Sequence, residues 1–207
     1  AALFILFTTG VSAASAQAIS KSAVTQARQR LGAKPLAQLF DQTARAWCQQ
    51  DAEYHAWQGL SLWAMDGTTF RTPDSTNNRA HFGAQAYASG KVASYPQVRA
   101  VSITAIPTHL VSDIAFGTYA QNEMLYAKTL LGRIADHSLT VFDRGFLSAE
   151  ILLGLTLGGQ ERHYLIPAKS NTKWEVLSGS TDDCLVRMRV SPQARAKAPE
   201  LPEHWTA

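Results

Sequence analysis

The sequence has little of what disulfide-stabilised, zinc-binding or thiol-based redox proteins contain. Only two cysteines occur in 207 residues, Cys48 and Cys184, and their separation matches no metal or redox motif. The simplest interpretation is two free thiols in a reducing cytoplasm. The six histidines show no spacing typical of a zinc site. Charged residues make up 17% of the chain and the formal net charge is +3, which permits nucleic-acid binding but does not by itself indicate it.

No apolar run is long enough to span a membrane, which takes about 20 residues. The apolar run at residues 3–11 is followed by Ala14-Ser15-Ala16, which resembles a signal-peptidase site. However, no basic residues precede this run, and the sequence does not begin with Met. We therefore predict a buried helix at residues 3–11. A secreted protein is the alternative, and it would require a basic segment upstream.

The first part of the chain is helical by its pattern. Residues 22–31 predict a short helix that ends at Gly32, and a second helix begins at Pro35. One side of the second helix carries an apolar stripe: Leu36, Leu39, Phe40, Thr43, Ala44 and Trp47. Arg28 and Arg30 project from the first helix and could contact DNA. The pattern alone favours the other interpretation, a solvated basic surface.

From Gln58 onwards the pattern becomes that of strands. Hydrophobic and β-branched runs predict five strands, at residues 60–65, 98–106, 109–116, 139–142 and 163–168. Helices are expected at residues 121–134 and after Ser148. This order predicts an α/β fold, a ribonuclease-H-like mixed sheet with helices on both faces. Its first strand lies in the centre, parallel to the strand at 139–142, which we expect to be buried on both faces.

Two aspartates follow strands that this topology makes neighbours. Asp66 comes directly after residues 60–65, and Asp143 directly after residues 139–142. Because parallel strands end at the same edge of a sheet, the two carboxylates are expected to lie close together. Carboxylates are ligands that Mg²⁺ or Mn²⁺ prefers, and a pair of such ions promotes phosphodiester displacement. The alternative is that each Asp merely ends a strand before a turn, in which Thr68 and Thr69 close the turn after Asp66.

Several short segments resemble one family. They are Asp-Gly-Thr-Thr at 66–69, His-Phe-Gly at 81–83, Thr-His-Leu-Val at 108–111 and Phe-Asp-Arg-Gly-Phe at 142–146. With residues 20–32, they resemble bacterial insertion-sequence transposases of the DDE class, of the insertion-sequence-four type. The resemblance covers nearly all of residues 20–207.

The aspartyl-nucleophile mechanism of haloacid dehalogenases is excluded, because it needs an Asp at position 64, where this chain has Ala64.

The resemblance implies a ribonuclease-H-like core that uses three acids and two divalent ions, Mg²⁺ or Mn²⁺. Such enzymes cut double-stranded DNA at transposon ends and join those ends to target DNA. Asp66 matches the first acid and Asp143 the second. The third is a Glu in the pattern Tyr-x-x-Arg-x-x-x-Glu-x-x-x-x-x-x-Lys, which no tyrosine of this chain begins. The resemblance also implies a bacterial cytoplasmic protein that acts as a homodimer on paired ends. The alternative is a catalytically inactive DNA-binding remnant.

The expected organisation is a helical N-terminal region at 1–57 and an incomplete catalytic core at 58–207. A β-rich insertion begins at about residue 170, and residues 192–202 read as an irregular connection. Arg144 could bind a phosphate or form a structural salt bridge. Lys169 and Lys173 could contact the DNA backbone or be solvated. Six other acids are poorly placed to act as the third one: Glu150, Glu161, Asp182, Asp183, Glu200 and Glu203.

Overall fold

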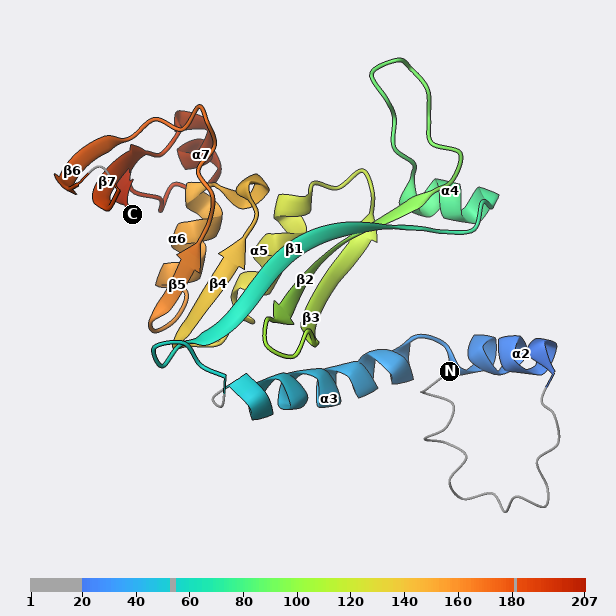
Figure 1. Ribbon diagram of the computed structural model, residues 1–207. Helices are drawn as coiled ribbons and strands as arrows, with labels where there is room; N and C mark the ends of the chain where they lie inside the picture. The colour runs from blue at the N-terminus through green and yellow to red at the C-terminus, as the bar shows by residue number, and fades with distance from the viewer. Residues whose placement is uncertain (1–19, 53–54, 181) are drawn as a thin grey trace. The chain divides into compact units, whose positions relative to one another are not determined.

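The computed structural model of the chain describes residues 20–52, 55–180 and 182–207 (Figure 1). The helix expected at residues 3–11 lies outside these residues. The chain divides into two compact units, residues 1–42 and residues 43–207.

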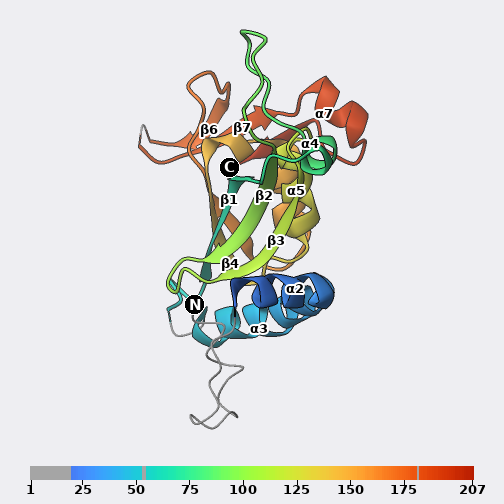
Figure 2. The same cartoon turned by 90° about the vertical axis from the view of Figure 1, so that its right-hand side faces the viewer.

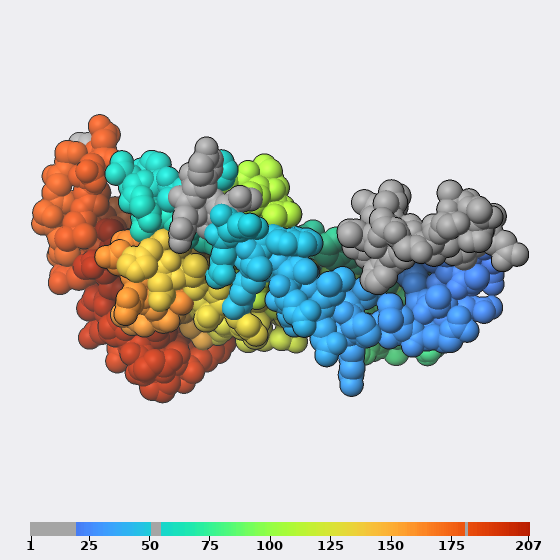
Figure 3. All heavy atoms as spheres, turned by 90° about the horizontal axis from the view of Figure 1, so that it is seen from below, coloured from blue at the N-terminus to red at the C-terminus, as the bar shows by residue number. Residues whose placement is uncertain are grey.

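Both expected N-terminal helices are present. Helix α2 spans Lys21–Leu31, with Ser20 as its N-cap and Gly32, at φ 70°, ending it. Helix α3 spans Lys34–Ala52 and continues into the second unit. Its apolar stripe is only partly buried, because Ala44 lies in the core whereas Leu36, Leu39 and Trp47 are 47%, 40% and 56% exposed. In Figure 3 the part of α3 that belongs to the second unit, in cyan, has atoms open on the face that is shown. Helical periodicity identifies an apolar side but not what covers it.

The second unit is built on a five-stranded mixed sheet in the order β3-β2-β1-β4-β5 (Figures 1 and 2). The strands are β1 (Ser61–Arg71), β2 (Gln97–Ala105), β3 (Val111–Thr118), β4 (Ser138–Phe142) and β5 (Arg162–Leu165). Strands β1, β2 and β3 form an antiparallel meander, while β4 is parallel to both β1 and β5. The prediction of a central first strand, parallel to the strand at 139–142, is confirmed.

Strand β1 does not end at Asp66, so that part of the prediction is wrong. Pairing with β4 stops at Met65 opposite Phe142, whereas pairing with β2 continues from Asp66 to Arg71. Thr68 and Thr69 therefore belong to the strand rather than to a turn. The reason is that β2 supplies backbone hydrogen-bond partners to this stretch, so Gly67 does not interrupt it.

Helices α5 (Glu123–Leu131) and α6 (Ala149–Leu157) pack against each other and against the sheet. The α6 helix begins at the expected cap, Ser148. The main core joins these helices to one face of the sheet and includes Trp63, Met65, Val101, Ile103, Ala127, Leu130, Ile151, Leu152 and Leu155. Burial along β4 alternates, so the expectation that this strand is buried on both faces is wrong for Leu139 and Val141, which are half-buried.

The sequence pattern did not predict two short helices, the second of which lies in the connection expected to be irregular at 192–202. Helix α4 (Thr76–Phe82) is capped by the side chain of Ser75, and α7 (Pro192–Lys197) by that of Ser191. Such helices lack a long apolar repeat, which explains why the pattern missed them.

Strands β6, β7 and β8 form a separate antiparallel sheet, with bounds Glu175–Gly179, Cys184–Arg189 and His204–Thr206. Both cysteines are free. None of the helices described is long and apolar enough to cross a membrane.

The packing of α6 gives a direct test of this core. Leu152 is fully buried, whereas Leu157 on the same helix is 77% exposed. We expect Leu152→Ala to lower the free energy of unfolding by about 2–5 kcal/mol, because it leaves a cavity. Leu157→Ala is the matched control and should change it by less than about 0.5 kcal/mol. Urea unfolding measures both, and equal losses in the two variants would contradict this packing.

Candidate active site

The two predicted aspartates lie next to each other at one edge of the sheet. Met65 on β1 pairs with Phe142 on β4, and each of these residues directly precedes one of the aspartates. The backbone register therefore places Asp66 and Asp143 next to each other, at the point where β1 and β4 part. Both residues are exposed. Asp143 caps the 3₁₀ helix Arg144–Phe146, which turns the chain away from the sheet.

Each aspartate is held by one of its two carboxylate oxygens. The Gly67 N–H donates to Asp66 Oδ1 at 2.8 Å, and the Gly145 N–H donates to Asp143 Oδ1 at 2.8 Å. Among the described residues, no ion pair or hydrogen bond engages the second oxygen of either carboxylate. Two fixed carboxylates that each offer an oxygen suit a hard divalent cation such as Mg²⁺. Among the residues that the structure describes, no three His, Cys, Asp or Glu side chains lie close enough together to hold a metal ion by themselves.

The structure brings a third acid, Glu123, to this edge. Glu123 is the first residue of α5, and a Cβ added at Gly67 would overlap its carboxylate. Sequence reasoning missed this residue, although a signal was present. Since β3 runs in the same direction as β1, the helix that follows β3 begins at the edge where Asp66 lies.

Electrostatics tie Glu123 to both aspartates. Burial raises the pKa of Glu123 above the ordinary glutamate value, and the negative charges of Asp143 and Asp66 raise it further. The positive charge of the Arg99 guanidinium partly offsets this rise in the pKa of Glu123. Arg99 is itself anchored, because it donates to the Gln121 carbonyl at 3.0 Å and lies over the Tyr119 ring. The edge therefore gathers three carboxylates, and Arg99 is a cation that acts on Glu123 among them.

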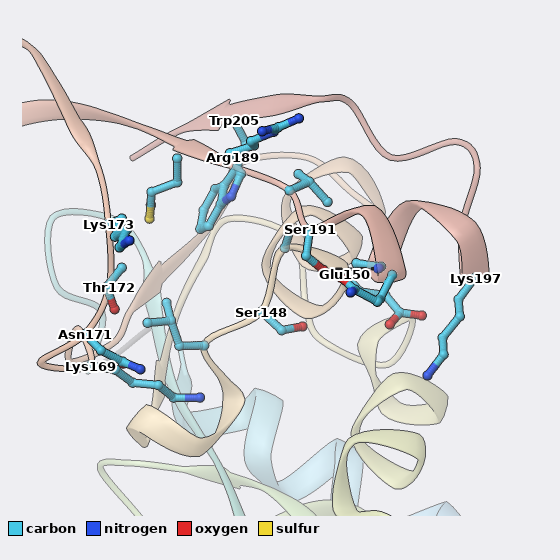
Figure 4. A pocket seen from close by; sticks show the side chains of 16 residues that line it. Ser148, Glu150, Lys169, Asn171, Thr172, Lys173, Arg189, Ser191, Lys197 and Trp205 are labelled. Carbon is cyan, nitrogen blue, oxygen red and sulfur yellow. Dashed lines mark hydrogen bonds between the residues drawn. The ribbon is translucent and has the colours of Figure 1, made fainter.

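A basic hollow of about 710 Å³ begins where the chain leaves the 3₁₀ helix, at Leu147 and Ser148. The predicted residues Lys169 and Lys173 line it on one side, and Lys197 lies across from them on α7 (Figure 4). Arg189 also lines the hollow and lies 3.7 Å from Glu203. Sequence reasoning named the first two lysines but missed Arg189 and Lys197, because α7 and β7 bring them there from later in the chain.

The remaining predicted contacts are exposed cations. Arg144 follows Asp143 directly and takes part in none of the ion pairs found in the described residues, so its structural salt bridge is not observed. Arg28 and Arg30 occupy the last turn of α2, in the N-terminal unit, and are also exposed. All three keep their guanidinium groups accessible to a phosphate.

The raised pKa of Glu123 predicts a pH-dependent loss of stability. A carboxyl group whose pKa is higher in the folded state binds its proton more tightly there, so its ionisation destabilises the fold as pH rises through that pKa. We expect Glu123→Gln, without metal, to melt at a higher temperature than the wild type at neutral pH. The difference should shrink as the pH falls below the ordinary glutamate pKa. Calorimetry checks this, and a lower melting temperature for the variant at neutral pH would contradict it.

Comparison with protein families identifies two matching regions. Residues 57–206 match the family described as transposase DDE domain. Residues 4–41 match the family described as insertion element 4 transposase N-terminal. The first match contains both Asp66 and Asp143.

Two Escherichia coli K12 proteins are similar to this chain. Transposase InsG for insertion sequence element IS4 is 39% identical over 190 residues, covering 91% of this chain and 42% of the relative. InsZ is 38% identical over 162 residues, covering 77% of this chain and 53% of that protein. The chain therefore spans about half the length of the curated relatives it matches.

Among solved structures, the piggyBac transposase synaptic complex with hairpin DNA aligns with a TM-score of 0.36 and 10% identity. The alignment covers 63% of this chain and 31% of that one. The two family matches and the relatives at nearly 40% identity are decisive. This chain belongs to the DDE transposases, in the insertion sequence IS4 group.

Proposed function

We propose that the complete protein hydrolyses phosphodiester bonds at transposon ends and transfers the resulting strands to target DNA. In this proposal, Asp66 and Asp143 bind the divalent ions, Mg²⁺ or Mn²⁺. The observation that carries it is the register of β1 and β4, which sets the two carboxylates side by side with one oxygen each available. Membership of the DDE family supports the reaction class.

The aspartates contribute fixed positions for negative charge. Asp66 lies within β1, where pairing to β2 on one side and to β4 up to Met65 on the other holds its backbone. Asp143 is held by the turn that its own Oδ1 closes with Gly145. A bound pair of divalent ions would activate the attacking oxygen and stabilise the leaving oxygen. Arg144 follows Asp143 and is proposed to bind a phosphate of the DNA.

The third acid of the family pattern has no counterpart in these 207 residues. We therefore expect this chain by itself to bind metal and DNA but not to cut. Two candidate functions follow for the protein of origin, an active transposase with the third acid elsewhere or an inactive DNA-binding remnant.

DNA is the proposed partner of both units. Arg28 and Arg30 on α2 are proposed to contact it from the helical region at 1–57, and Lys169 and Lys173 from the core at 58–207. The basic hollow supports the second contact, because it gathers four cations and begins at Leu147, in the segment that follows Asp143. A homodimer on paired ends, in the bacterial cytoplasm, completes the proposal and rests on family membership alone.

Restoring the missing acid tests the cutting function. We expect this chain, fused to the part of InsG that lies beyond its matched region, to cleave insertion-sequence ends when Mg²⁺ is added. Asp66→Asn or Asp143→Asn should abolish cleavage yet keep DNA binding, because each removes one metal ligand and leaves the basic residues intact. Gel assays of cleavage and binding measure both. Asp182→Asn, at an exposed turn, is the control and should cut normally. Normal cutting by either site variant would disprove the metal assignment, and a fusion that binds but never cuts would support the remnant.

The hollow makes a prediction about salt dependence. If Lys169 and Lys173 each contact a phosphate, Lys169→Gln or Lys173→Gln should reduce the slope of log affinity against log salt by about 0.9. Titrations of a fluorescent DNA duplex at several salt concentrations measure the slope. Arg133→Gln removes an exposed cation from the turn between α5 and β4, at the opposite edge of the sheet, and should leave the slope unchanged. Equal effects from all three variants would indicate only a general loss of charge.

A further inference from the structure

We propose that Glu123 is a positioning residue of this metal site, one that strengthens the hold of Asp66 and Asp143 on a divalent cation. Its carboxylate lies against Gly67, the residue that follows Asp66, and adds a third negative charge at the same edge. This inference rests on the proposed function, because it assumes that the two aspartates bind metal. It is separate from the third acid of the family pattern, which belongs to a different motif.

The space at Gly67 is the first argument. Gly67 does not have a positive φ, so its backbone conformation would accept any residue. What the glycine provides is room, because the place where a Cβ would stand is filled by the end of the Glu123 side chain. Any side chain at position 67 would displace that carboxylate. The candidate metal ligand Asp66 is therefore followed directly by the residue against which the Glu123 carboxylate lies.

The rigidity of α5 is the second argument. The Asn122 side chain caps this helix by accepting from the Met124 N–H at 3.0 Å. One turn further, buried Tyr126 donates its hydroxyl to the Thr118 carbonyl on β3 at 3.1 Å. The helix is thus tied to the sheet at its beginning. Glu123 is held at the aspartate edge by the fold rather than by a flexible loop.

Charge balance is the third argument. The negative charges of Asp66 and Asp143 make ionisation of Glu123 less favourable, whereas the positive charge of Arg99 favours it. A divalent cation bound by the aspartates would offset this repulsion. Because the three acids are not close enough to share one ion as ligands, Glu123 acts on the aspartates and their ion through its charge. Residues that surround metal ligands typically change affinity by about 10–100-fold.

Manganese binding to the purified 207-residue chain tests the role without any DNA reaction. Electron paramagnetic resonance of free Mn²⁺ gives the dissociation constant. We expect Asp66→Asn and Asp143→Asn to lose binding and Glu123→Gln to weaken it about tenfold. Gly67→Ala keeps all three acids but displaces the Glu123 carboxylate, and it should weaken binding in the same direction. Glu161→Gln is the control, because it removes an exposed glutamate that pairs with His137, and it should bind as the wild type does.

The outcomes separate the two proposals. Unchanged Mn²⁺ affinity in the aspartate variants would overturn the metal site itself. Loss in those variants with wild-type affinity in Glu123→Gln would overturn only the role of Glu123. Wild-type affinity in Gly67→Ala beside a loss in Glu123→Gln would overturn the placement of the carboxylate at Gly67. Circular-dichroism melting without metal confirms that each variant is folded.

Discussion

The parallel pairing of β1 with β4 is the constraint on which the site depends. Ladder hydrogen bonds between these strands fix the register as far as Met65 and Phe142, and the next residue on each strand is an aspartate. Beyond that point, β1 continues with β2 while the chain after β4 turns away through a 3₁₀ helix. The edge where the strands part exposes both carboxylates on a backbone that the rest of the sheet keeps in place.

The arrangement of these carboxylates lowers the stability of the fold but favours the binding of a divalent cation. Three carboxylates lie at this edge, and Arg99 offsets only part of the effect that burial and the two aspartates have on Glu123. Like charges held together destabilise a fold, and a divalent cation turns the same repulsion into binding energy. The core beneath the edge, including Met65, Val101 and Ile103, is closely packed and apolar. It can therefore hold groups that would move apart if they were mounted on a flexible loop.

The distribution of basic residues matters more than their total. A net charge of +3 is small for a protein proposed to bind DNA. However, four cations from the segment after β5, from β7 and from α7 line one hollow that begins at Leu147, just after the 3₁₀ helix. The second sheet and α7 bring Arg189 and Lys197 to the residues that follow β5. A local concentration of charge of this kind attracts a phosphate backbone even where the overall charge is mild.

The sequence by itself determined the strand order, most helices and the adjacency of Asp66 and Asp143, because alternation, helical periodicity and the rules of parallel connection are local or topological signals. Only the tertiary structure decided that β1 continues past Asp66, since the partner strand β2 satisfies its backbone. Tertiary contacts also decided the exposure of Leu36 and Trp47 and the cations that share the hollow. The approach of Glu123 to Gly67 belongs to this second group. It depends on a helix and a strand more than 50 residues apart in the chain, and no local pattern records where two such elements meet.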